Sequence, residues 1–305
     1  MALSSFPGAV KNAPLQERQS VGLPDGRQLC FAEYGAADGF PVFGFHGTPG
    51  SRLMFRLAHD PACRAGLRLI APDRPGFGGS THEPGRTLAG WASDIAVLAK
   101  ALGIDRFGVA GISGGGPYAA ACAALLTKNV ALAALISPMG PVRSTQQPET
   151  GGSAQQKMFR LVSVLSPAMR GAFSVGRLML LNAPDSTYGL IMSRAAPADR
   201  PILMRPTVRK NLLEGIAEGL SSGVQGTIEE LKIFGRPWDL PFKDIKAPVL
   251  LWQGTGDRNV PVAAALQLAK LIPACQLFRI EGAGHYWVFD HMDEVLAEMA
   301  KRLIG

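Results

Sequence analysis

The sequence predicts an α/β fold in which a doubly wound, mostly parallel sheet carries an inserted helical segment. Short apolar runs alternate with helix-spaced segments in the first 140 residues, and the same alternation resumes after about residue 245. Between these two regions the strand pattern disappears. The chain has 305 residues, which is enough for one large domain of this kind with an insertion.

The elements of the first 140 residues follow from turn residues and hydrophobic spacing. Residues 1–17 hold several turn signals and are interpreted as an N-terminal leader. Ser51 is a suitable N-cap for the helix after the first buried strand. The expected elements are a hairpin over 21–34 around Leu23-Pro24-Asp25-Gly26, a strand over 41–45, a helix over 51–65, a strand over 67–72, a helix over 87–102, a strand and a helix within 107–127, and a strand over 130–136.

The alternation breaks between residues 141 and 240, where helical pieces are separated by Gly and Pro. We expect this stretch to be a helical cap inserted into an α/β core of residues 18–140 and 241–305. Its apolar side chains either face a substrate or form the cap's own core; they are Met158, Phe159, Leu161, Leu165, Met169, Phe173, Leu178 and Leu180. The elements expected after the cap are a strand over 248–253, a helix over 262–271, a strand over 276–280 and a closing helix over 288–303.

Charge and cysteine content argue against several classes of partner. The net charge is +7, but its most basic part, Arg194 to Lys210, carries no aromatic residue, which favours a solvated face over a nucleic-acid site. The four cysteines have no C-x-x-C spacing, which fits a reducing compartment. The N-terminus has no apolar core of a secretory signal, and no apolar run reaches about 18 residues. We therefore expect a cytoplasmic protein without stable membrane insertion.

The most informative stretch is Phe107 to Ala121, where an apolar run leads into Gly111-Ile112-Ser113-Gly114-Gly115. The spacing G-x-S-x-G is typical of a nucleophile elbow, a sharp strand-to-helix turn that exposes one side chain at its tip. Residues without a Cβ let the strand and the helix approach closely around a strained serine. A phosphate loop is excluded because the sequence has no G-x-x-x-x-G-K-[S/T] motif. The pattern predicts Ser113 as a nucleophile.

A serine hydroxyl needs a base that takes its proton and a carboxylate that orients the base. His285 follows the last predicted strand in Gly282-Ala283-Gly284-His285, and Asp257 follows the preceding one in Gly254-Thr255-Gly256-Asp257. The chain order Ser, Asp, His is the one expected after this elbow. Because the carboxyl ends of parallel strands meet at one edge of a sheet, we expect Ser113, Asp257 and His285 to converge there.

Other histidines and aspartates are weaker candidates for the base and the acid. Helical or polar-loop positions favour surface roles for His59, His82 and His291. Asp239 and Asp244 lie near the cap boundary with no strand before them. These positions give no reason to expect convergence with the nucleophile.

The tetrahedral intermediate of acyl transfer needs two backbone N–H donors. The N–H of Gly114, directly after the nucleophile, is one candidate. The second is expected from the loop after the first buried strand, where Pro49 has no N–H, so Thr48 is favoured over Gly47. His46, which precedes the nucleophile in the chain, is interpreted together with Gly47 as support for this loop.

The chain resembles the capped α/β-hydrolase superfamily in four motifs, which are H-G-T-P-G (46–50), D-R-P-G-F-G-G-S (73–80), G-I-S-G-G (111–115) and G-D…G-H (256–285). The resemblance covers about 40–140 and 245–303. It implies the α/β-hydrolase fold and a triad of Ser113, Asp257 and His285. It also implies that residues 74–80 shape the pocket floor without doing chemistry. A serine at the elbow, in place of an aspartate, argues against haloalkane dehalogenases and epoxide hydrolases.

The leading hypothesis is a serine esterase or lactonase that works through an acyl-enzyme intermediate. In it Ser113 attacks the carbonyl carbon, and His285 protonates the leaving alcohol and then activates water. The Met- and Leu-rich cap suggests a small, largely apolar substrate. We expect no cofactor and no metal.

The alternatives come from different classes. His46 to Gly50 is close to the H-G-G-P-G motif of proline iminopeptidases, which need carboxylates to hold the substrate's free amine. The cap offers such carboxylates at Glu214, Glu218, Glu229 and Glu230. A ligand-binding protein on a hydrolase scaffold is a further alternative, because fold does not fix function. Carbon–carbon hydrolases and cofactor-free perhydrolases share the triad, and the sequence leaves oligomeric state and pathway open.

Overall fold

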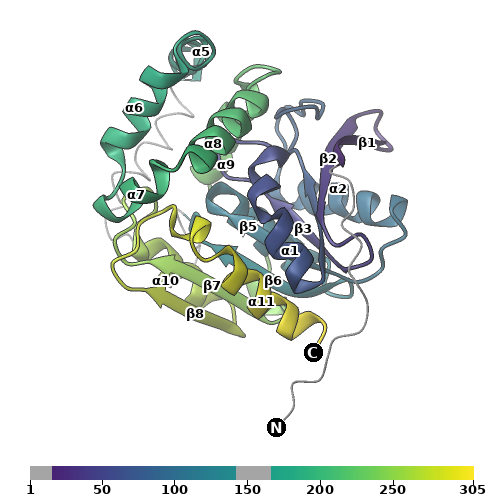
Figure 1. The fold of residues 1–305 in the computed structure, drawn as a ribbon. Coiled ribbons are helices and arrows are strands. Elements are labelled where there is room, and N and C mark those ends of the chain that lie inside the picture. Colours follow the sequence, from purple (N-terminus) through teal and green to yellow (C-terminus); the bar gives the residue numbers. More distant parts are fainter. Residues whose placement is uncertain (1–15, 142–165) are drawn as a thin grey trace.

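The structure is a computed structural model that describes residues 16–141 and 166–305 (Figure 1). Eight strands of this part form one sheet, namely β1 Gln16–Gly22, β2 Gln28–Gly35, β3 Phe40–Phe45, β4 Leu67–Pro72, β5 Phe107–Ile112, β6 Val130–Ile136, β7 Val249–Gly254 and β8 Cys275–Ile280. Their order across the sheet is β1-β2-β4-β3-β5-β6-β7-β8. β2 pairs antiparallel with β1 and β4, and all other pairs are parallel. The predicted mostly parallel sheet is confirmed.

The predicted hairpin is formed by β1 and β2, with Val21 opposite Leu29. Gly26 in its turn has a φ of 86°, which a residue with a side chain rarely adopts. β1 begins at Gln16, five residues before the predicted start, because its side chains are exposed or half-buried and give no apolar signal there. Residues 1–15, the rest of the predicted leader, lie outside the described residues.

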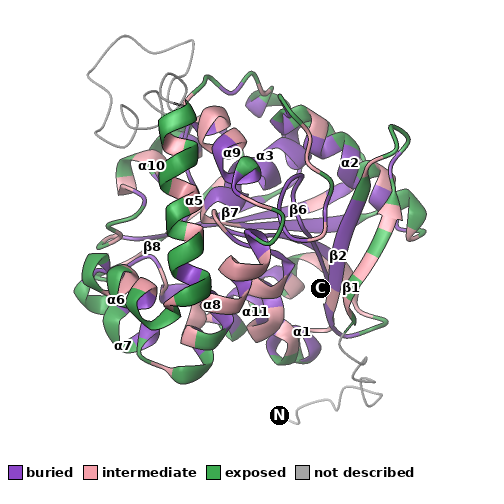
Figure 2. Cartoon of the chain, turned by 90° about the horizontal axis from the view of Figure 1, so that it is seen from above, coloured by how far each residue is buried: buried purple, intermediate pink, exposed green. Residues whose placement is uncertain are grey.

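Helices cover both faces of the sheet. They are α1 His59–Ala65, α2 Leu88–Ala101, α3 Gly116–Leu125, α10 Val262–Leu271 and α11 Met292–Leu303. The view from above shows α2, α3 and α10 on one side of the sheet and α1 and α11 on the other (Figure 2). Side chains along β3 alternate between the two cores, since Phe43 and Phe45 pack in the first and Val42 in the second.

Two predicted helices begin differently from the expectation. The segment predicted as one helix over 51–65 starts as a 3₁₀ helix, η1 Arg52–Ala58, and continues as α1. Its predicted N-cap is confirmed, because the Ser51 hydroxyl accepts a hydrogen bond from the N–H of Leu53. The closing helix starts at Met292 and not at Val288, since Trp287–Phe289 forms a separate 3₁₀ turn, η5.

The described residues after β6 and before β7 form helices and contain no strand. They include α5 Ser166–Asn182, α6 Pro184–Arg194, α7 Arg200–Leu203, α8 Pro206–Gly219 and α9 Gln225–Phe234, which we call the cap helices (Figure 1). No described helix is both long and apolar enough to cross a bilayer. The cap boundaries at 141 and 240 stay a prediction. Of the apolar residues expected in the cap, Met169, Phe173, Leu178 and Leu180 belong to α5, and Met158, Phe159, Leu161 and Leu165 lie outside the described residues.

A buried ion-pair cluster joins the cap helices to the core. Glu230 of α9 is fully buried and pairs with Arg74 and with Arg86, whose Nη2 lies 3.2 Å from Glu230 Oε1. Arg74 donates from Nη1 to the carbonyl of His46 at 2.5 Å and from Nη2 to that of Gly47 at 3.2 Å. Through Arg74, a carboxylate of the cap helices therefore holds the loop that follows β3.

Replacing Glu230 by Gln should destabilise the protein strongly. The change leaves two buried guanidinium groups without their anion, and breaking a buried pair on one side costs about 3–5 kcal/mol. Urea unfolding followed by circular dichroism measures the difference.

Glu229→Gln is the matched control, because Glu229 lies beside Glu230 in α9 but is partly exposed and pairs with Lys232 at 2.9 Å. We expect Glu229→Gln to lower the free energy of unfolding by less than about 1 kcal/mol. Equal losses for the two variants would contradict a buried-cluster role for Glu230.

Candidate active site

Ser113 lies at the turn from β5 into α3 and has a φ of 54°, in the left-handed region that serine rarely adopts. Close backbone contacts explain why glycines surround it. A Cβ on Gly111 would lie 2.3 Å from the carbonyl oxygen of Gly115, and a Cβ on Gly115 would lie 2.1 Å from that of Phe45. Neither position admits a side chain, so the strand and the helix approach as the G-x-S-x-G spacing predicts.

Asp257 and His285 come from the loops after β7 and β8. His285 Nδ1 lies 2.7 Å from Asp257 Oδ2. The other oxygen, Oδ1, accepts the backbone N–H groups of Asn259 and Val260 at 2.7 and 2.8 Å. This carboxylate is fully buried, and Gln253 also donates to its Oδ2 at 3.1 Å. A carboxylate partner places the proton on Nδ1 and leaves Nε2 as a proton acceptor.

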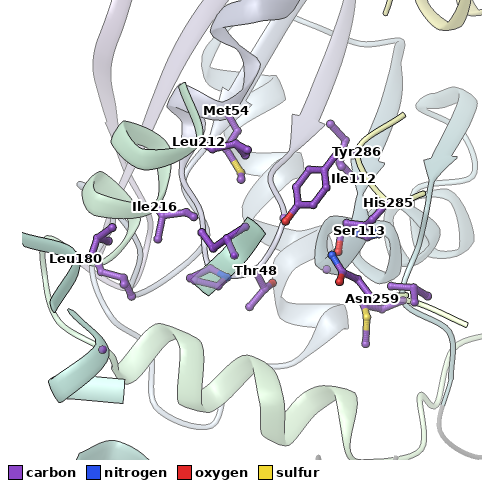
Figure 3. A pocket seen from close by; sticks show the side chains of 18 of the residues that line it. Thr48, Met54, Ile112, Ser113, Leu180, Leu212, Ile216, Asn259, His285 and Tyr286 are labelled. Carbon is purple, nitrogen blue, oxygen red and sulfur yellow. The ribbon is translucent and has the colours of Figure 1, made fainter. Parts of the chain in front are cut away.

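Ser113 and His285 line the same cavity (Figure 3). The three residues predicted as nucleophile, base and acid are thus brought to one edge of the sheet, two of them at the cavity wall and Asp257 behind the imidazole.

The remaining histidines lie away from this cavity. The ring of His59 accepts a hydrogen bond from the N–H of Gly35, and His291 pairs with Glu294 at the surface. His82 does not line the cavity either. None of these three is placed to serve Ser113.

His46 is fully buried, and both of its ring nitrogens are engaged. Nδ1 lies 2.8 Å from its acceptor, the Gly47 carbonyl, and Nε2 accepts from the N–H of Arg74 at 3.2 Å. Burial, together with the Arg74 charge, holds the pKa of His46 well below its usual value, so the ring is neutral. These contacts fit the support role expected for His46 and Gly47.

Thr48 and Gly114, the predicted oxyanion donors, meet at the cavity wall. A Cβ on Gly114 would lie 2.1 Å from Thr48 Oγ1, so a side chain there would require Thr48 to shift. Gly47 lies beside the nucleophile, since a Cβ on it would be 3.7 Å from Ser113 Cβ. The loop after β3 and the turn after β5 are therefore in close contact beside Ser113.

The cavity has a volume of about 480 Å³ and lies between the sheet edge and the cap helices. In the described part of the chain, no Asp or Glu lines it, and Arg177 is its one Lys or Arg. Arg177 donates to the carbonyls of Leu220 and Ser221. The cap side of the wall consists of Phe173, Gly176, Arg177, Leu180, Thr187, Ile191, Leu212, Ile216, Leu220, Leu231 and Phe234.

Residues 74–80 do not line this cavity, so the expectation that they shape its floor is wrong. The Arg74 side chain turns into the interior and binds the carbonyls of the loop at 46–50 from behind. A buried arginine with carbonyl and carboxylate partners supports a loop and does not form a pocket surface.

Three residues near the base have no local sequence signal. Tyr286 and Asn259 line the cavity and hydrogen bond to each other through their side chains. Burial raises the pKa of Tyr286 to about 12, so its hydroxyl stays protonated. Asp199 of the short 3₁₀ turn η3 Pro197–Asp199 accepts hydrogen bonds from the backbone of the His285 loop.

The sequence of the chain matches a known protein family. The family model described as "Alpha/beta hydrolase family" matches residues 42–298. A non-heme chloroperoxidase from Streptomyces lividans is 28% identical over 287 residues, which cover 89% of this chain and 94% of the relative. A bifunctional esterase/perhydrolase from Acinetobacter calcoaceticus is 24% identical over 275 residues, which cover 87% of this chain and 92% of the relative.

Among solved structures, epoxide hydrolase A from Mycobacterium thermoresistibile matches with a TM-score of 0.70 and 20% identity, covering 95% of this chain and 98% of that chain. This likeness shows the fold alone. The family model spans most of the sequence, including the elbow and the loops that carry Asp257 and His285. The chain therefore belongs to the alpha/beta hydrolase family.

Proposed function

We propose that this hydrolase cleaves a carboxylic ester or a lactone with Ser113 as nucleophile, His285 as base and Asp257 as the acid that orients it. One observation carries the proposal. The imidazole, held by Asp257 at 2.7 Å, lines the same cavity as a serine on a strained turn. An imidazole oriented in this way can take the serine proton during attack on a carbonyl carbon.

The proposed reaction has two halves. As Ser113 Oγ bonds to the carbonyl carbon, its proton moves to His285 Nε2, and the N–H groups of Thr48 and Gly114 stabilise the oxyanion. The imidazolium then gives the proton to the leaving alkoxide, which departs as an alcohol or, for a lactone, stays tethered to the acyl group. Water activated by His285 attacks the acyl-enzyme, which releases the acid and restores Ser113.

The cavity supports an uncharged, largely apolar acyl group as the substrate. Met54, Leu212, Ile216 and Phe234 contribute apolar wall, and no described carboxylate faces the interior. A substrate ammonium group would find no anion among the described lining residues. An apolar chain, in contrast, gains about 0.8 kcal/mol for each buried methylene.

The four glutamates that suggested an iminopeptidase each have a cationic partner. Glu214 pairs with Arg56, Glu218 with Arg52, Glu229 with Lys232 and Glu230 with Arg74. None of them lines the cavity. We therefore favour ester or lactone cleavage over capture of a peptide amine.

Ser113→Ala should abolish both hydrolysis and covalent labelling. Loss of the nucleophile typically lowers kcat by at least about 10⁴-fold. A fluorophosphonate probe and a panel of p-nitrophenyl esters and lactones measure the two effects.

Ser93→Ala is the matched control for this experiment, because Ser93 is an exposed residue of α2 and its hydroxyl bonds only to the Ala89 carbonyl in the described contacts. It should label and turn over as the wild type does. Turnover that survives in Ser113→Ala would refute the assigned nucleophile, and ligand binding without any labelling of the wild type would favour a binding protein.

The pH dependence of kcat/KM should show an acid limb. A protonated His285 cannot accept the Ser113 proton, so the rate should fall as the pH is lowered. Steady-state kinetics between pH 5 and 8 test this, with His291→Gln as a control that leaves the profile unchanged. A flat profile would argue against His285 as the base.

Ile216→Trp should shorten the preferred acyl chain. Ile216 lies on α8 and faces the cavity (Figure 3), so a larger ring would displace the far end of a long acyl group. Loss of two buried methylenes corresponds to about 1.6 kcal/mol, or about 15-fold in kcat/KM for octanoate relative to acetate.

Leu178→Trp is the control for this change, because Leu178 lies on α5 with 54% of its surface exposed and does not line the cavity. It should leave the octanoate-to-acetate ratio unaltered. The same ratio in both variants would show that the cavity does not hold the acyl group.

A further inference from the structure

Asp199 reaches from the cap segment to the loop that carries His285. It lies in η3, directly before α7, and only 1% of its surface is exposed. Its Oδ2 accepts the backbone N–H of His285 at 2.9 Å, and its Oδ1 accepts that of Tyr286 at 2.8 Å. These contacts join residues that are 86 and 87 positions apart in the sequence.

Asp199 uses both oxygens of its side chain for this long-range contact. It precedes α7 with a helical φ of −80° and ψ of −24°, and its side chain makes no cap hydrogen bond to that helix. Both oxygens instead accept backbone N–H groups of the His285 loop.

The His285 loop is shaped to receive this carboxylate. Gly282 has a φ of 72°, and a Cβ on Gly284 would lie 2.2 Å from the Asp199 carboxyl carbon. A loop with two glycines has more backbone freedom than one with side chains, so it needs external bonds to hold one conformation. Asp199 supplies two such bonds to the backbone, and Asp257 supplies one to the imidazole.

We propose that Asp199 is a positioning residue for proton transfer at His285, an inference that rests on the proposed function. Asp257 fixes the ring orientation from the core, and Asp199 fixes the position of the backbone from the cap segment. Both constraints are needed, because a displacement of about 1 Å between Oγ and Nε2 can cost about 100-fold in rate. Completion of the base therefore depends on the cap segment.

Asp199→Asn is the first test. An asparagine amide has one acceptor oxygen and one donor nitrogen, so one of the two backbone N–H groups loses its partner. We expect kcat for the preferred ester, and the rate of fluorophosphonate labelling at Ser113, to fall together by about 10- to 100-fold. KM should change by less than about threefold, because Asp199 does not line the cavity.

Asp185→Asn is the matched control. Asp185 lies on α6 with 85% of its side chain exposed and pairs with Arg209 at the surface. It should keep wild-type kcat and labelling. Thermal unfolding of each variant ensures that rates are compared well below the melting temperature, where all molecules are folded.

Gly284→Ala gives a second route to the same displacement. Its new methyl group needs the space of the Asp199 carboxylate, so kcat should fall as it does in Asp199→Asn. Asp199→Ala removes the carboxylate and frees this space. In the Asp199→Ala background, the fold-loss of kcat caused by Gly284→Ala should therefore be at least about fivefold smaller than in the wild-type background.

The outcomes separate the two proposals. Three outcomes would each overturn the role of Asp199 and leave the Ser113 assignment standing. They are wild-type kcat and labelling in Asp199→Asn, additive effects in the double variant, and a rise in KM without loss of kcat. Absence of Ser113-dependent labelling in the wild type would overturn the proposed function and this inference with it. Coupled losses of kcat and labelling support the role.

Discussion

The sharp turn from β5 into α3 at Ser113 is the constraint on which the rest of the site depends. Gly111 and Gly115 allow the strand and the helix to lie this close, and Ser113 takes a positive φ in the turn. β6, β7 and β8 continue the sheet parallel to β5, so their following loops open at the same edge. Topology therefore delivers Asp257 and His285 to the serine, although they lie far away along the chain.

Features with a local cause could be predicted from the sequence. The glycine spacing around Ser113 and the loops after β7 and β8 each follow from a few neighbouring residues. The environments of Glu229 and Glu230 could not be predicted in this way. The two are adjacent and chemically identical, yet one pairs with Lys232 near the surface and the other is fully buried between two arginines. Only distant partners distinguish them, and the same holds for Asp199.

The pairing of charges also explains why the cavity is apolar although the cap helices carry many ionisable groups. Each glutamate considered as an amine ligand is neutralised by an arginine or lysine outside the cavity. The interior then keeps few competing dipoles. In such surroundings the N–H groups of Thr48 and Gly114, which we propose as oxyanion donors, would act at a low effective dielectric, where hydrogen bonds to a developing oxyanion are strongest.

The described segment between β6 and β7 thus makes two kinds of contact, which differ in how well they tolerate substitution. Side chains such as Leu212 and Ile216 meet the cavity with apolar surface, and apolar exchanges of similar volume cost little. Asp199 and Glu230 hold the loops of His285 and of Thr48 through buried hydrogen bonds, whose loss leaves unpaired polar groups. Under the proposed function, substitutions in the apolar wall can therefore change substrate preference, whereas the contacts of Asp199 and Glu230 must persist for the proposed reacting groups to keep their positions.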